Sequence, residues 1–173
     1  MIRYWKRKGF HVFCLDECTF VIEPYAPYGW FPKGSNPTIK TNYTRKRFHA
    51  LGALGMKSFY MSFSRKINRD VFLVFLKRLL KKRGKILVLM DNARWHKAKI
   101  VQKFAEENGH RIKIEHFLKY TPELNPIEPR WKEMKKELGC RLFEETKEMK
   151  VVVRRKSYRK DFFTNKLYHY LCL

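Results

Sequence analysis

Runs of apolar residues along the chain predict a sheet with helices packed on its faces. Residues 11–22 form an apolar, aromatic and β-branched run, which is typical of a strand. Its alternation places Cys14, Asp16 and Cys18 on one side, and Leu15 and Glu17 on the other. Because both sides are largely apolar, we expect this strand to be central in the sheet and covered on both faces.

The rest of the pattern predicts further strands and helices. In chain order these are strands at 48–54 and 58–63, a helix at 68–83, a strand at 85–90, a helix at 97–108, a strand at 112–117 and a helix at 126–138. Residues 55–57 are the expected hairpin turn, Asn68 the expected N-cap and Gly84 the expected helix stop. The order predicts an α/β fold, with a mixed five-stranded sheet flanked by helices.

Two segments fall outside this scheme. Residues 24–37 carry four prolines and two glycines among aromatic residues and predict a long ordered loop. Residues 150–160 are strongly basic, and residues 161–173 could form a last helix. We expect one catalytic domain over residues 1–145, with a basic extension, 146–173, packed on it.

The charge of the chain points to a polyanionic partner. There are 39 Lys and Arg against 16 Asp and Glu, a formal net charge of +23. Self-repulsion of that size destabilises a compact state, and binding to nucleic acid relieves it. An acidic membrane surface is the less favoured alternative, and no segment approaches the ~20 apolar residues of a membrane span. Cys14 and Cys18 form an isolated C-x₃-C, which favours free thiols over a zinc site.

Three carboxylates stand out by their position. Asp16 interrupts an apolar strand, Asp91 ends the strand at 85–90, and Glu128 falls in the first turn of a helix. An unpaired carboxylate buried in a strand costs several kcal/mol, so Asp16 needs a cation, a partner or an opening to solvent. For Glu128 there is a purely structural alternative, because Asn125 as N-cap would make it part of a capping-box-like N-x-x-E.

Three short motifs resemble the signatures of the mariner-type DDE transposases, and most closely the bacterial and archaeal insertion-sequence family numbered 630. The motifs are Leu15-Asp16-Glu17, then Leu89-Met90-Asp91-Asn92-Ala93 with His96, then Tyr120-Thr121-Pro122-Glu123-Leu124-Asn125-Pro126-Ile127-Glu128 with Trp131. The segments 29–34 and 51–53 are similar to that family too. The resemblance covers residues 10–140 in the right order.

The resemblance implies a ribonuclease-H-like fold and an enzyme that cuts DNA strands and transfers them. It also implies that Asp16, Asp91 and Glu128 are catalytic and bind two Mg²⁺ ions, for which Mn²⁺ can substitute. The physics agrees, because two carboxylates ~4 Å apart repel by about 4 kcal/mol at an effective dielectric near 20, so a cluster requires cations or raised pKa values. Asp16 is the expected bridging ligand, whereas Glu17 points to the opposite face and is interpreted as structural.

Other residues have weaker claims to function. His96 is expected to contact the scissile phosphate or to order a water, although a lone histidine could be incidental. Trp131 is interpreted as a core residue. The expected DNA-binding residues are Trp30, Lys33, Lys40, Arg45, Lys46, Arg47 and Asn92. Two of these have structural alternatives, since Trp30 could anchor its loop on the core and Asn92 could cap a turn.

The implied partners are transposon-end and target DNA, bound by a homodimer, in the cytoplasm and nucleoid of a prokaryote and without a membrane. Family members carry a helix-turn-helix module ahead of the catalytic domain, and only about ten residues precede the first strand here. We therefore expect a separate chain to supply that module, or the protein to be a remnant. The rival hypotheses are a non-catalytic DNA-binding regulator and a general ribonuclease-H-like nuclease.

Overall fold

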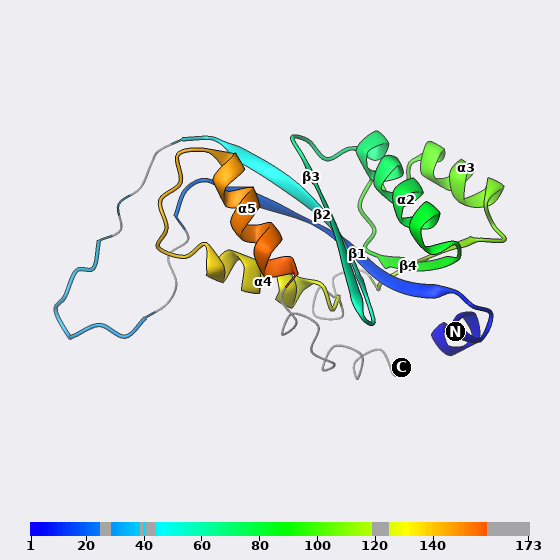
Figure 1. Ribbon diagram of the computed structural model, residues 1–173, viewed down its shortest axis with the longest axis horizontal. Helices are drawn as coiled ribbons and strands as arrows, with labels where there is room; N and C mark the ends of the chain where they lie inside the picture. The colour runs from blue at the N-terminus through cyan, green and yellow to red at the C-terminus, as the bar shows by residue number, and fades with distance from the viewer. Residues whose placement is uncertain (25–28, 39, 41–43, 119–124, 159–173) are drawn as a thin grey trace.

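A five-stranded sheet organises the computed structural model, which describes residues 1–24, 29–38, 40, 44–118 and 125–158 (Figure 1). Its strands are β1 (His11–Val21), β2 (Arg47–Gly55), β3 (Ser58–Ser64), β4 (Ile86–Met90) and β5 (Ile112–His116). They lie in the order β3-β2-β1-β4-β5, with antiparallel β1–β2 and β2–β3 pairs and parallel β1–β4 and β4–β5 pairs. The predicted mixed sheet and its central first strand are confirmed.

Helices cover both faces of this sheet. They are α1 (Ile2–Arg7), α2 (Arg69–Arg83), α3 (Lys99–Glu107), α4 (Glu128–Glu137) and α5 (Thr146–Ser157). Figure 1 shows α2 and α3 together at one end of the molecule, and α4 and α5 together at the other. Because the side chains of β1 alternate, one set of its residues faces α2 while the other set faces α1 and α4.

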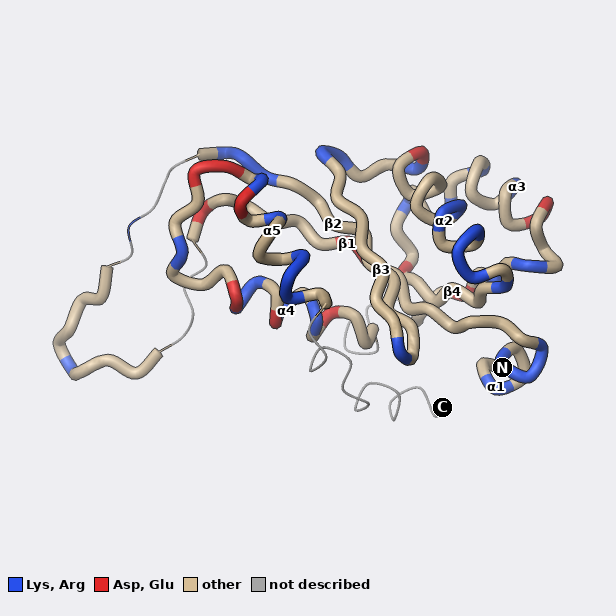
Figure 2. Tube along the Cα trace, in the orientation of Figure 1, with Lys and Arg blue, Asp and Glu red and all other residues tan. Residues whose placement is uncertain are grey.

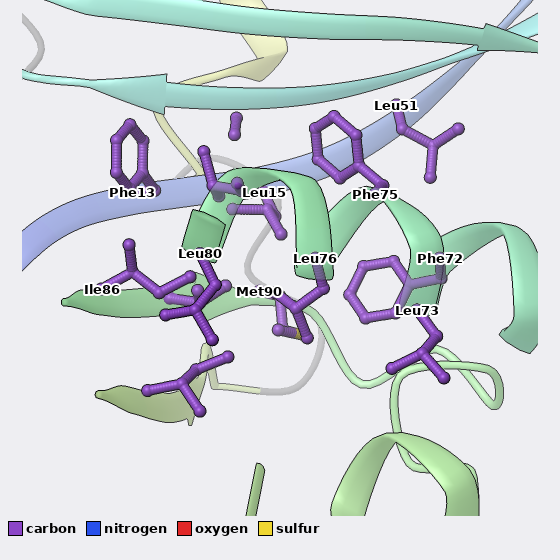
Figure 3. Close-up of a cluster of buried hydrophobic side chains, with 14 of the residues drawn as sticks. Phe13, Leu15, Leu51, Phe72, Leu73, Phe75, Leu76, Leu80, Ile86 and Met90 are labelled. Carbon is purple, nitrogen blue, oxygen red and sulfur yellow. The ribbon is translucent and has the colours of Figure 1, made fainter. Parts of the chain in front are cut away.

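The face towards α2 holds the larger apolar cluster. Phe13 and Leu15 of β1 belong to this cluster together with Phe72 and Leu76 of α2, and Figure 3 labels all four. Asn68 caps α2 as predicted, since its Oδ1 accepts the Val71 N–H at 2.9 Å. Gly84 ends the helix with φ +77°, a conformation that L side chains rarely adopt.

The opposite face holds a second cluster, under α4 and α5. Phe20 and Phe48 stack with ring centroids 5.2 Å apart, and Trp131 of α4 lies edge-on to Phe20. Met149 and Val153 of α5 are buried in the same cluster. The segment 146–157 thus forms a helix that the sequence did not predict, and so does 2–7.

The start of α4 differs from the prediction. The helix begins at Glu128 rather than at Pro126, and its N-cap residue is Ile127, not Asn125. The Asn125 side chain instead accepts the Ile127 N–H at 3.4 Å, which organises the turn before the helix. Glu128 is therefore the first helical residue rather than the third, and the capping-box interpretation does not apply.

Gly52 of β2 is a point of close contact with Trp131 of α4 and with Ile127 just before it. A Cβ at Gly52 would lie 2.7 Å from the Trp131 indole and 2.8 Å from Ile127 Cδ1. Both neighbours are buried, so neither can move aside without disturbing the cluster. The missing side chain at this position lets the indole lie directly against β2.

We predict that Gly52→Ala destabilises the protein by about 1–3 kcal/mol, because the added methyl overpacks the contact with Trp131. Urea unfolding followed by circular dichroism measures the change. In a Trp131→Leu background the same substitution should cost clearly less, since the ring that it meets is gone. Equal costs in both backgrounds would show that the Trp131 ring is not the source of the destabilisation.

Candidate active site

Asp16 and Glu128 form an acidic pair between β1 and α4. Asp16 sits in the middle of β1 on the face covered by α4, and the Trp131 indole N–H donates to its Oδ2 at 3.0 Å. Burial, and then the negative charge of Glu128, raise the pKa of Asp16 to about 7. Hydrogen bonds from the Glu17 backbone N–H and from the Trp131 indole lower this pKa, but they do not offset burial and the charge of Glu128.

Asp91 lies just beyond the last residue of β4, and its carboxylate is held in place by hydrogen bonds. Its Oδ1 accepts the Ala93 N–H at 2.9 Å and lies 2.8 Å from Nδ1 of His96. The hydrogen bond with His96 is the main reason why the pKa of Asp91 falls below its usual range. The side chain is 56% exposed, so Asp91 remains a charged group open to a ligand from solution.

His96 is buried and lies between two carboxylates. Its Nδ1 faces Asp91, and its Nε2 lies 2.9 Å from Oε1 of Glu17. Burial alone would lower the pKa of His96, but the hydrogen bonds with Asp91 and Glu17 outweigh it and raise the pKa to about 9. Both ring nitrogens contact carboxylates, so the buried ring holds Asp91 from the protein side and does not face the solvent.

The structure thus couples the predicted residues in two groups: Asp16 with Glu128, and Asp91 with His96. Across the described ranges, no group of three or more His, Cys, Asp or Glu side chains is arranged to hold a metal ion. The donor chemistry nevertheless fits a hard divalent cation. All three acids offer oxygen ligands, and a cation beside Asp16 and Glu128 would remove the repulsion that raises the pKa of Asp16.

The predicted DNA-binding residues lie mostly on the surface before β2. Lys33, Lys40, Arg45 and Arg47 are exposed, and Lys46 forms an ion pair with Glu145. Trp30 is fully exposed, so it does not anchor its loop on the core. Figure 2 shows further Lys and Arg residues along α1, α2 and α5.

Asn92 takes a different position from these basic residues. Its side-chain amide donates to the Phe117 carbonyl at 3.0 Å and so ties the end of β4 to the segment after β5. This contact spans 25 positions, so it differs from the turn cap that the sequence left open for Asn92. The motif residues 120–124 lie outside the described residues, as does the possible last helix at 161–173.

Sequence reasoning missed three contacts at this site. Trp131 is a core residue, as interpreted, but it also donates to Asp16, and its spacing of three from Glu128 on one helix was a usable signal. Glu17 does point away from Asp16, yet it contacts His96. Trp95 donates to the same glutamate at 3.3 Å, and nothing in the sequence pointed to that contact.

Residues 11–150 match the sequence model of the DDE superfamily endonucleases, and the chain belongs to this family. Its fold is that of a ribonuclease-H-like transposase catalytic domain, as expected. No curated protein matches the chain in sequence. The described residues include no helix long and apolar enough to cross a membrane.

Solved structures of Mos1 transposase share this fold. A pre-cleavage Mos1 transpososome superposes with a TM-score of 0.75 at 20% identity, over 98% of this chain and 56% of that one. The Mos1 paired-end complex with the left transposon end gives 0.74 at 21% identity, over 98% and 55%. The isolated catalytic domain of Mos1 mariner transposase gives 0.69 at 19% identity, over 98% and 82%. The chain therefore spans a little over half of the longer Mos1 chain.

We predict that Asp16→Asn removes part of the pH dependence of stability. A folded-state pKa of about 7, above the ordinary 3.8, stabilises the protein at low pH, and this stabilisation is lost as pH rises through 7. In metal-free buffer the free energy of unfolding of the variant should therefore rise relative to that of the wild type between pH 5.5 and 8. The rise is at most about 1.4 kcal/mol per pH unit.

Urea unfolding at both pH values, with EDTA present, measures this difference. Glu107→Gln is the matched control, because Glu107 is an exposed carboxylate whose only recorded ion pair, with Lys103, spans 3.9 Å. A stability difference between Asp16→Asn and wild type that is the same at pH 5.5 and 8 would contradict the pKa shift.

Proposed function

We propose that this chain is the catalytic domain of a transposase that cuts DNA strands and transfers them with the help of divalent metal ions. The observation that carries the proposal is the Asp16–Glu128 pair, in which burial and then the charge of Glu128 raise the pKa of Asp16 to about 7. In a chain with a net charge of +23, and in a family of endonucleases, such a pair is best explained as a cation site beside bound DNA.

Each acidic residue has a distinct part in the proposed site. Asp16 is the inner ligand, oriented by the Trp131 indole, and Glu128 joins it from the start of α4. Asp91 contributes from the end of β4, where the open ends of parallel strands commonly bind ligands. Mg²⁺ or Mn²⁺ bound here would neutralise negative charge on the phosphate oxygens. It would also lower the pKa of the attacking water or DNA 3′-hydroxyl.

The solved relatives support divalent metals and DNA as the ligands. Mos1 paired-end complexes are described with Mn and with Mg, and another holds the left transposon end. By analogy we propose two Mg²⁺ ions, replaceable by Mn²⁺, and transposon-end and target DNA for this chain. We also propose that the chain acts as a homodimer on DNA. We place it in the insertion-sequence branch, in the cytoplasm and nucleoid of a prokaryote.

DNA binding should be strong, salt-sensitive and poorly selective for sequence. If six to ten phosphates are neutralised, affinity falls by about 10³–10⁵ between 50 and 200 mM salt. Fluorescence anisotropy with two unrelated duplexes of equal length measures both properties. Tight binding to one duplex that persists at 200 mM salt would contradict this expectation.

Asp91→Asn should lower Mg²⁺-dependent cleavage of a DNA end by at least about 100-fold while leaving DNA binding equal or slightly tighter. The amide keeps an Oδ1 acceptor for Ala93 but loses the charge that binds a cation and repels phosphate. A gel assay for cleavage and joining, with Mg²⁺ and with Mn²⁺, measures the effect.

Glu107→Gln, which removes an exposed carboxylate, should cleave like the wild type. Cleavage without joining would favour a general nuclease. A wild type that binds DNA but is inert with both metals would favour the non-catalytic regulator, and unchanged cleavage in Asp91→Asn would rule out the proposed role of Asp91.

A further inference from the structure

Glu17 is buried and fully engaged, although it lies on the face of β1 opposite Asp16. Its side chain is only 7% exposed. One carboxylate oxygen, Oε1, lies 2.9 Å from Nε2 of His96, and the other, Oε2, accepts the Trp95 indole N–H at 3.3 Å. A buried carboxylate is tolerated when both oxygens have donors, so these contacts explain how β1 accommodates a second acid.

The His96 ring in turn has almost no freedom to move. Its side chain is completely buried, and its centroid lies 4.4 Å from the Phe72 ring of α2. Trp95 meets it edge-on at 5.9 Å. The two ring nitrogens point at Glu17 and Asp91, so a flip of the ring would break both hydrogen bonds.

This arrangement determines how Asp91 presents its carboxylate. Oδ1 receives the Ala93 N–H and lies against Nδ1 of His96, so it is occupied by protein donors. Among the described residues no hydrogen-bond donor to Oδ2 is recorded, and the side chain is 56% exposed. Asp91 therefore presents Oδ2 to the solvent, while Oδ1 is held by Ala93 and His96.

We propose that Glu17 is a positioning residue for Asp91, acting through His96 and supported by Trp95. The proposal rests on the proposed function, in which Asp91 is a metal ligand. It gives the two adjacent acids of β1 complementary tasks: Asp16 acts directly on one face, while Glu17 orients Asp91 from the other face. One strand thereby sets the relative placement of two ligands that are 75 positions apart in the sequence.

A purely stabilising role for Glu17 makes different predictions. If Glu17 serves only as the hydrogen-bond partner of the buried His96, its loss lowers the stability of the protein. The metal affinity of the folded protein then stays unchanged. Partners that orient a metal ligand typically change metal affinity or activity by 10–100-fold when they are removed. Metal affinity measured on folded protein therefore separates the two roles.

The first test needs no metal. Imidazole N–H protons held between carboxylates exchange slowly and give resonances at low field in ¹H NMR. The wild type should show such signals for His96, assigned by their loss in His96→Gln. Glu17→Met should lose the Nε2–H signal, and Glu17→Gln, which keeps one acceptor, should shift it. Unaltered signals in Glu17→Met would overturn the proposal.

The second test measures Mn²⁺ binding by electron paramagnetic resonance on protein shown to be folded by circular dichroism. We expect the Kd for Mn²⁺ to rise about 10–100-fold in Glu17→Met, and less in Glu17→Gln. Trp95→Phe, which leaves the His96 contact in place, should have the smallest effect. Glu107→Gln and Glu107→Met are the matched controls and should keep the wild-type affinity.

Failure of this inference can be told apart from failure of the proposed function. If wild-type protein cleaves DNA and Asp91→Asn does not, but Glu17→Met keeps wild-type Mn²⁺ affinity, only the positioning role is wrong. If the wild type cleaves nothing, but Mn²⁺ affinity falls in Asp91→Asn and Glu17→Met alike, the positioning role stands without the transposase chemistry.

Discussion

The alternation of side chains along β1 is the constraint on which the site depends. This strand is central and covered on both faces, so consecutive residues enter different environments. Asp16 faces α4 and meets Trp131 and Glu128, whereas Glu17 faces the α2 side and meets His96. A shift of one residue in the register of β1 would put one of the two acids in the other's place and Leu15 or Cys18 in the place that it left.

Packing and chemistry are coupled on the α4 side. The indole of Trp131 rests against Gly52 of β2 and donates its N–H to Asp16. The same ring that fills the core therefore orients an acidic side chain, and α4 also delivers Glu128 from its first turn. A side chain at Gly52 would collide with Trp131 and Ile127, so this glycine lets α4 pack closely on β2.

The charged groups of the molecule include many Lys and Arg residues outside the core and a pair of acids, Asp16 and Glu128, between β1 and α4. Basic side chains lie along α1, α2 and α5, while Asp16 and Glu128 repel each other. The Asp91 side is balanced differently, because His96 lies between Asp91 and Glu17 and compensates part of their charge. Bound cations would neutralise the acids, whereas bound DNA would neutralise the Lys and Arg residues.

Local chemistry in the sequence was enough for the elements and the acidic positions, but not for their contacts. The apolar run of β1, the Asn68 cap and the Gly84 stop depend on near neighbours, so their signals are readable without a fold. Helix α5 was not predicted, because it buries few residues, Met149 and Val153 among them, and lies in a strongly basic part of the sequence. Which residues meet across elements was decided only by tertiary packing. The pairing of Glu17 with His96 spans 79 positions and that of Asp16 with Trp131 spans 115, and no local pattern encodes separations of that length.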